Sequence, residues 1–233
     1  MGGQPGSDDA SGEAQKRMTI SEPVTLVTDY LLALLTGLLA YWMWSRSYEA
    51  AGAGRIETSS WLRWWSAAYA ASAVSGVFGG TVHGFSHALR PPLLAGLWMV
   101  TLQSLVVAGF AVVCAVIAVS RAHRARARWM AGLAFGACGL WVAAHPVFLS
   151  ALVPYSAALL VVTVFALRHP LSASSRLLLS GIAVSVVAAA IQRSRLSLHP
   201  NFNHNDLFHV VQGLAVWLLY RGVMRHDALP ARR

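Results

Sequence analysis

The sequence predicts an all-α membrane protein, a bundle of seven transmembrane helices, and three observations lead to this fold class. The chain of 233 residues is 56% hydrophobic and 12% charged, with a mean hydropathy of +0.54, which is far more apolar than a soluble domain needs. Apolar runs long enough to cross a hydrocarbon core of about 30 Å, which takes about 20 helical residues, recur along the chain. These runs are rich in Leu, Ala and Val and lack the alternation of barrel strands, which favours helices.

The seven runs follow one another closely, and no loop between them is long enough to hold a second domain. The first ends before Arg46, the second at "GGTVHGFSH", the third before "SRAHRARARW" and the fourth at "AAHP". The fifth ends before Arg168, the sixth before Arg193, and the seventh begins at "NFNHNDLFH". The predicted spans are Val24 to Trp44, Trp61 to Val82, Leu93 to Val119, Trp129 to Ala144, Val147 to Leu167, Leu177 to Gln192 and Asp206 to Met224.

Polar segments flank this domain. Residues 1–20 are polar and contain Gly and Ser, which predicts a disordered extracytoplasmic tail. Residues 21–226 form the predicted seven-helix domain, and residues 227–233 form a short cytoplasmic tail. The first apolar run is too long and starts too late for a cleavable signal peptide. Cys114 and Cys138 both fall inside predicted spans, and we interpret them as small buried residues rather than as a disulfide or metal site.

The basic residues predict the orientation of the chain. With the link between the third and fourth spans inside, the outer segments keep only Lys16, Arg17, Arg90, Arg193 and Arg195 of the 18 basic residues. The positive-inside rule then places the N-terminus outside and the C-terminus in the cytoplasm. We interpret "SRAHRARARW" as a topology signal that contacts anionic lipid headgroups, and not as a nucleic-acid patch. The inner residues are Arg46, Arg55, Arg63, Arg121, Arg124, Arg126, Arg128, Arg168, Arg176, Arg221, Arg225, Arg232 and Arg233.

This orientation brings two thirds of the histidines to the outer membrane face. The three others, His123, His169 and His226, lie among arginines in cytoplasmic links, where we expect solvated side chains. Asp29 lies about five residues into the first span, about 7 Å deep, and Asp206 lies at the mouth of the seventh. Ionisable groups at such a depth are costly and are functional-site candidates. The outer histidines are His83, His87, His145, His199, His204 and His209.

Imidazoles grouped with one or two carboxylates are what a zinc site requires. His83 and His87 are four residues apart and share a helix face if the helix continues between them. His204 and His209 are five apart and converge only if the chain before Asn205 is not helical. These four histidines are the predicted metal ligands.

Each of these residues also has a structural interpretation. Asp29 can be the partner of an outer histidine or of Arg90, and a hydrogen bond between helices explains His83 and His209 equally well. We interpret the tryptophans as interface anchors and lipid-facing bulk. The polar residues around the start of the seventh span can instead cap that helix and complement its positive end; these are Asn203, Asn205 and Asp206.

Seven spans, a histidine at the end of the second and "NHNDLFHVV" at the start of the seventh resemble the CREST superfamily, which includes the alkaline ceramidases and the progestin/adiponectin receptors. In that superfamily a Ser-x3-His pattern in the second span, an Asp in the third and His-x3-His in the seventh surround a zinc ion whose water attacks a lipid amide. The resemblance matches its histidines to His83 and His209. Its serine falls at Gly79 and its other histidine at Asn205, and the third span holds no acid.

The resemblance implies a membrane-embedded, zinc-dependent hydrolase that cleaves a lipid amide or ester at the outer end of the bundle. Zinc would be held by His83, His209 and a third ligand, His204 or His87, and would lower the pKa of a bound water to about 7. Asp29 or Asp206 would act as general base or would orient a ligand, and the substrate would enter sideways from the outer leaflet.

Two other functions fit the same residues. In one, haem lies between helices with histidines as axial ligands. In the other, the protein is a non-enzymatic receptor or channel, whose outer histidines bind a ligand or sense pH because histidine ionises near neutrality. In every case the expected partners are membrane lipids and a lipid substrate or ligand, with no nucleic acid, and the oligomeric state is not predicted.

Overall fold

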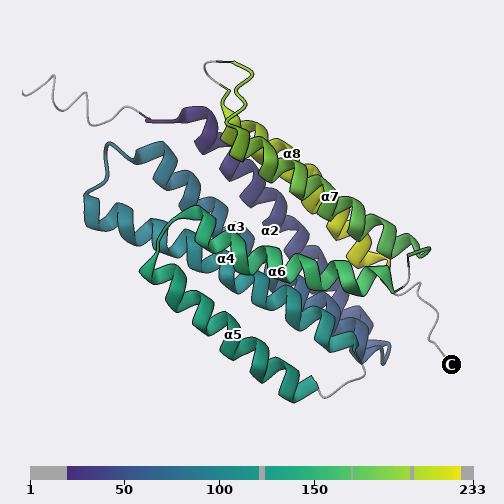
Figure 1. The fold of residues 1–233 in the computed structure, drawn as a ribbon. Coiled ribbons are helices and arrows are strands. Elements are labelled where there is room, and N and C mark those ends of the chain that lie inside the picture. Colours follow the sequence, from purple (N-terminus) through teal and green to yellow (C-terminus); the bar gives the residue numbers. More distant parts are fainter. Residues whose placement is uncertain (1–19, 121–123, 169, 200–201, 227–233) are drawn as a thin grey trace, which may run out of the picture.

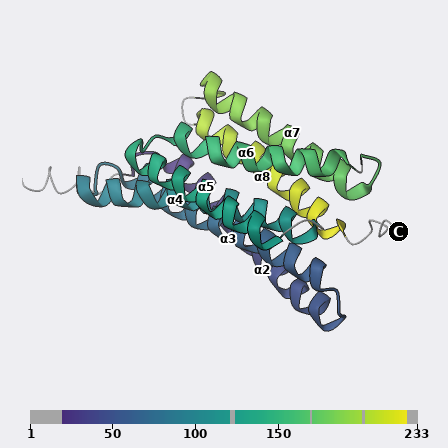
Figure 2. The same ribbon diagram turned by 60° about the horizontal axis from the view of Figure 1, so that its bottom comes forward.

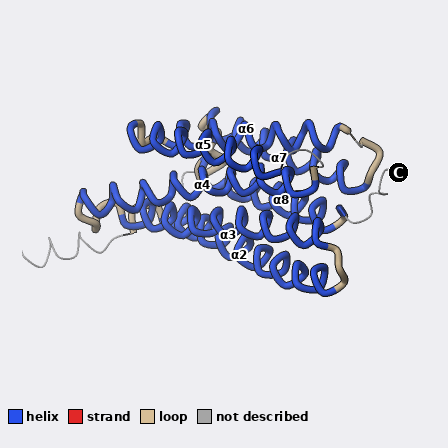
Figure 3. The backbone as a smooth tube through the Cα atoms, turned by 90° about the horizontal axis from the view of Figure 1, so that it is seen from below, coloured by secondary structure: helices blue, strands red, loops and turns tan. Residues whose placement is uncertain are grey.

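The structure is a computed structural model that describes residues 20–120, 124–168, 170–199 and 202–226. This part of the chain forms seven helices joined by short links, and consecutive helices run in alternating directions (Figures 1 and 3). Outside the helices, His199 and Phe202 form an isolated β-bridge. The helices are α2 (Pro23–Gly52), α3 (Ile56–Phe85), α4 (Pro91–Val119), α5 (Arg124–Ala144), α6 (Phe148–Leu167), α7 (Ala173–Ser194) and α8 (His204–Met224).

The all-helical prediction is confirmed, since each of the seven predicted spans corresponds to one of these helices, and only Val147, which precedes α6, lies outside its helix. Six of them are long and apolar enough to cross a membrane, which is consistent with a multi-pass membrane protein. The helix outside this group is α3, because Trp, Ser and Gly lower its hydropathy. The largest difference in bounds is at α2, which continues two turns past Trp44. There Arg46 and Glu49 form an exposed ion pair of 2.6 Å, as suits the polar end of a helix.

Two tryptophans of α3 lie in the core of the bundle. Trp61 and Trp65 are fully buried, so the prediction that the tryptophans are anchors or face lipid is wrong for this pair. The indole Nε1 of Trp61 donates a hydrogen bond of 3.2 Å to the carbonyl of Val223 on α8. The ring of His226 stacks on Trp61 with 4.4 Å between the ring centroids, so His226 is half-buried and packed on this ring, and not a fully solvated side chain. His123 and His169 lie outside the described residues.

Glycines at every fourth position bring α3 unusually close to α2. A Cβ at Gly80 would lie 2.8 Å from the Cβ of Asp29, and one at Gly84 would lie 2.9 Å from the side chain of Leu26. A Cβ at Gly76 would also be tight, at 3.0 Å from the nearest α2 atom. Small residues at such spacing let membrane helices approach closely. This ridge therefore holds Asp29 against the last turns of α3.

The remaining helices complete the bundle around this pair. α7 packs along α8, where Gly181 lies against Leu219 and Gly222 lies against Leu178. Figure 2 shows α7 at one edge of the bundle and the α2–α3 hairpin at the other. α5 lies at the outside of the bundle (Figure 1), and of its described residues only Val142 is buried. The two cysteines are free thiols, with Cys114 buried and Cys138 half-buried.

Candidate functional site

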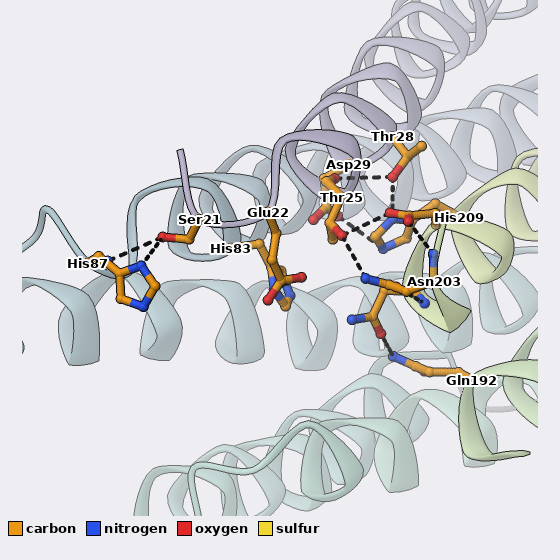
Figure 4. A network of polar contacts seen from close by, with 12 residues as sticks. Ser21, Glu22, Thr25, Thr28, Asp29, His83, His87, Gln192, Asn203 and His209 are labelled. Atoms are coloured by element: carbon orange, nitrogen blue, oxygen red, sulfur yellow. Dashed lines mark hydrogen bonds and ion pairs between the residues drawn. The ribbon is translucent and has the colours of Figure 1, made fainter. Parts of the chain in front are cut away.

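Polar side chains from four helices meet at one end of the bundle. This end contains the first turns of α2 and α8 and the last turns of α3 and α7, because consecutive helices alternate in direction. Figure 4 shows the resulting network, which extends from Ser21 and His87 at one side to Gln192 at the other. It joins segments that are up to 181 residues apart in the sequence.

Asp29 and His209 form the buried centre of this network. Asp29 Oδ1 lies 3.2 Å from His209 Nε2, and the exposed fraction of both side chains is below one tenth. The other imidazole nitrogen, Nδ1, lies 3.0 Å from the hydroxyl oxygen of Thr28, so α2 contacts both nitrogens of the ring. Asp29 Oδ2 is buried and has no hydrogen-bond partner in the described part of the chain. The carboxylate is therefore paired through one oxygen only.

Asp206 has a different role, because both of its oxygens are occupied by structural contacts. Its Oδ2 accepts a hydrogen bond of 2.7 Å from the backbone N–H of Asn203, and its Oδ1 accepts one of 2.8 Å from the hydroxyl of Thr25. The side chain of Asn203 accepts from the N–H of Asn205 at 2.7 Å, which completes a capping box. The capping interpretation is thus confirmed for Asn203 and Asp206, whereas the side-chain oxygen of Asn205 accepts a hydrogen bond of 3.4 Å from Gln192. Asp206 ties the start of α8 to α2.

A second histidine–carboxylate pair lies at the end of α3. His83 Nδ1 is 3.5 Å from Oε2 of Glu22, and this oxygen makes no hydrogen bond to the described residues. The chain before α2 is fixed to the same end, since the backbone N–H of Ser21 donates to the carbonyl of Gly84 at 2.8 Å. The hydroxyl of Ser21 also lies 3.1 Å from Nδ1 of His87.

A cavity of about 380 Å³ extends from this polar end into the bundle. Described residues of α2, α3, α4, α6, α7 and α8 line it. Asp29, His83 and His209 line the part at this polar end, whereas Leu105, Leu159 and Val216 line its deeper part. At 1.5 Å per residue, the lining from Asp29 to Thr36 covers about 10 Å along α2, and that from His83 to Ser72 about 16 Å along α3. The cavity is polar at this end and mainly apolar beyond, where the hydroxyls of Thr36 and Ser72 donate to carbonyls of their own helices.

The four predicted metal ligands do not come together in the structure. α3 ends at Phe85, so His87 lies beyond the helix that carries His83. α8 begins at His204, so His204 is already helical and its direction differs by about 140° from that of His209. Among the residues that the structure describes, no group of three or more His, Cys, Asp or Glu side chains is arranged to hold a metal ion. With both nitrogens of His209 in contact with α2, these residues do not fit the zinc site that the resemblance implies.

Of the two predicted catalytic carboxylates, Asp29 lines the cavity and Asp206 lies outside its lining. Thr25, Thr28 and Glu22 also belong to the network, and none of them was predicted. Thr25 could have been predicted, because it lies four residues before Asp29 and therefore on the same helix face. The contacts of Glu22 depend on the path of the chain before α2, for which the sequence holds no comparable signal.

Comparison with known proteins places the chain in a family but assigns it no activity. No curated protein and no solved structure is significantly similar to it. Nothing in these comparisons links it to the CREST superfamily. Residues 24–228, which extend from the start of α2 to just beyond α8, match the family described as "Family of unknown function (DUF6962)". The chain belongs to this family.

Proposed function

We propose that the chain is a seven-span membrane protein that binds a lipid-like amphiphile inside its bundle, as a non-enzymatic receptor does. The single observation that carries this proposal is the cavity, with the Asp29–His209 pair at its outer end and apolar side chains beyond. Its volume lies in the range of about 300 to 1,000 Å³ that is usual for small-molecule sites. A polar headgroup would lie beside Asp29 and His209, and an apolar chain would extend toward Leu159 and Val216.

The proposal counts α3 as a membrane span, in addition to the six helices that are long and apolar enough. This helix has 30 residues and is about 45 Å long, and it packs against both α2 and α4. Its polar side chains bond to neighbouring helices: Ser66 donates to the carbonyl of Ala40, and Tyr69 donates to that of Val216. Hydroxyl groups used in this way do not face lipid, so a lower hydropathy is compatible with a membrane span.

The proposed orientation has the polar end of the cavity outside the cytoplasm. With α3 counted as a span, the helix ends that carry arginine-rich links fall on one face, which the positive-inside rule assigns to the cytoplasm. Asp29 and His209 then lie below the outer face, at a depth that an amphiphile of the outer leaflet reaches. A membrane lipid or a lipid-derived molecule is therefore a more suitable ligand than a soluble peptide.

A second candidate function is the hydrolysis of a lipid amide or ester, which the resemblance to the CREST superfamily implies. The Asp29–His209 pair favours it, because a buried carboxylate that orients an imidazole is half of a general-base arrangement. Assays on a panel of lipid amides and esters, with and without added zinc, test this candidate. Turnover that is lost in His209→Ala would support hydrolysis, and equal turnover in both proteins would exclude a role for this pair.

The binding proposal is tested with a photoreactive probe, a long-chain alcohol that carries a diazirine near the end of its chain. We expect peptide mapping after irradiation to find adducts at the deep lining residues Leu159 and Val216, and excess dodecanol to suppress them. The exposed residues Val153 and Leu160 on the outer face of α6 are the internal control, because any membrane-dissolved probe reaches them. Adducts that are confined to such exposed positions would contradict the proposal.

A further inference from the structure

We infer that the cavity prefers an amphiphile with a cationic head, such as a long-chain amine, and that Asp29 is the residue that selects it. This inference rests on the proposed binding function and specifies its ligand class. It follows from the pairing of Asp29, from the charges at the outer end of the cavity, and from the shape of the space beyond.

Asp29 has an acceptor for which the described residues offer no donor. Its side chain is more than nine-tenths buried, Oδ1 faces His209 and Oδ2 has no hydrogen-bond partner in the part of the chain that the structure covers. A buried carboxylate oxygen without a donor is costly. The terminal torsion of an aspartate is broad, so a small rotation suffices to present either oxygen to the cavity that Asp29 lines. A ligand ammonium would supply the missing donors and a compensating charge.

The charges at the outer end of the cavity favour the same ligand. Asp29 lines the cavity and faces His209, and Glu22, which lies outside the lining, places a second carboxylate 3.5 Å from the lining residue His83. The described residues that line the cavity include no Lys or Arg. A carboxylate or phosphate headgroup would therefore meet acceptors of its own sign, whereas an ammonium meets carboxylate oxygens.

The shape of the cavity indicates one extended chain rather than a compact cation. The lining continues for about 10 to 16 Å from the polar end, and its deep part contains Leu105, Leu159 and Val216. Small cations would leave this apolar part of the cavity without a partner. Burial of an alkyl chain there contributes about 0.8 kcal/mol per methylene group, so chain and head both contribute to binding.

The test compares three probes with the same chain, dodecylamine, dodecanol and dodecanoic acid, by titration calorimetry on the full-length protein in detergent. We expect dodecylamine to bind about 10- to 100-fold more tightly than dodecanol. This is the gain in affinity that a hydrogen bond to a charged group typically gives. Dodecanoic acid should bind most weakly. In Asp29→Asn the preference for the amine should vanish while dodecanol still binds. Glu49→Gln is the matched control, because it removes one negative charge from an exposed position outside the cavity lining.

The outcomes separate this inference from the function on which it rests. If dodecanol binds and dodecylamine binds no better, the inference is wrong and the binding proposal stands. If no probe binds, both are wrong. If Asp29→Asn does not fold, the order of the three probes on the unmodified protein decides, and a preference for dodecanoic acid would overturn the inference.

Discussion

Two buried carboxylates, Asp29 and Asp206, lie at the same end of the bundle and differ in how their oxygens are used. Asp206 accepts hydrogen bonds through both oxygens, from Thr25 and from the backbone of Asn203. Asp29 meets His209 through one oxygen, and the other has no partner among the described residues. At the scale of single residues, Asp206 is therefore a structural residue and Asp29 is the residue available to a ligand.

Replacement of Asp206 should weaken the fold without changing the site. Asp206→Ala removes the acceptor of the Thr25 hydroxyl and one half of the capping box. We expect the free energy of unfolding in mixed micelles to fall by about 1–3 kcal/mol, and the affinity for dodecanol to remain the same in the folded fraction. Loss of dodecanol binding by a fully folded Asp206→Ala protein would instead assign this carboxylate to the site.

The close approach of α2 and α3 can be tested with a single methyl group. Gly80→Ala puts a Cβ 2.8 Å from the Cβ of Asp29, against a neighbour that cannot move independently of its helix. We expect a loss of about 1–3 kcal/mol in the free energy of unfolding. Gly96→Ala on α4 is the matched control, because nothing lies within 4 Å of its added Cβ. It should be neutral or stabilise by about 0.5–1 kcal/mol. Equal effects of the two substitutions would contradict the glycine ridge.

At the scale of the elements, α3 shows that composition predicts where a helix lies in the sequence better than it predicts what packs around that helix. Its Trp and Ser residues reduce its hydropathy, yet Trp61 and Trp65 are buried and Ser66 bonds to α2. A rule for the average position of tryptophan cannot distinguish the face of a helix that meets other helices. Packing between distant segments decides this, and here the partner of Trp61 is Val223, 162 residues away.

Cysteine labelling tests whether α3 crosses the membrane. Ala53 precedes α3 and Ala88 follows it, and both are exposed. In a background with Cys114→Ala and Cys138→Ala, an impermeant maleimide should label Ala88→Cys in intact cells. It should label Ala53→Cys only after permeabilisation, because this position faces the cytoplasm in the proposed orientation. Labelling of both cysteines from the same side would exclude α3 as a membrane span. The helices that either precede or follow α3 would then have the opposite orientation to the proposed one.

The site was predictable from the sequence only in part. Asp29 and His209 were identified because ionisable residues inside apolar runs are rare, and the cap at Asn203 and Asp206 followed from residue types before a helix. The predicted metal site required His204 to lie before the start of α8, and His87 to lie in the same helix as His83. The observed ends of α3 and α8 rule out both conditions, because α3 ends before His87 and α8 already includes His204. Neither histidine therefore shares a helix face with its expected partner. The sequence alone does not determine such ends to within one residue.

At the scale of the whole molecule, the closest helix packing lies at the α2–α3 and α7–α8 contacts, and the bundle encloses a cavity elsewhere. Glycines bring α2 to α3 and α7 to α8, whereas the space lined by Leu105, Leu159 and Val216 stays open toward the polar end. Burial of an amphiphile there would join the two closely packed pairs. A ligand that binds only the folded bundle would also raise its stability, in proportion to the logarithm of ligand concentration.

Closing the cavity from within tests whether the bundle holds a ligand. Gly79 lines this cavity, and a Cβ at this position meets its nearest neighbour, Thr101, at 3.4 Å, an ordinary contact, so Gly79→Leu can extend into the space. Gly96→Leu adds the same side chain on α4 where nothing lies within 4 Å of the Cβ. The measurement is the equilibrium affinity for dodecanol of both variants and the unmodified protein. We expect at least about tenfold weaker binding in Gly79→Leu, or a loss of about 1.4 kcal/mol, and no change in Gly96→Leu. Equal affinities in all three folded proteins would contradict a ligand site inside the bundle.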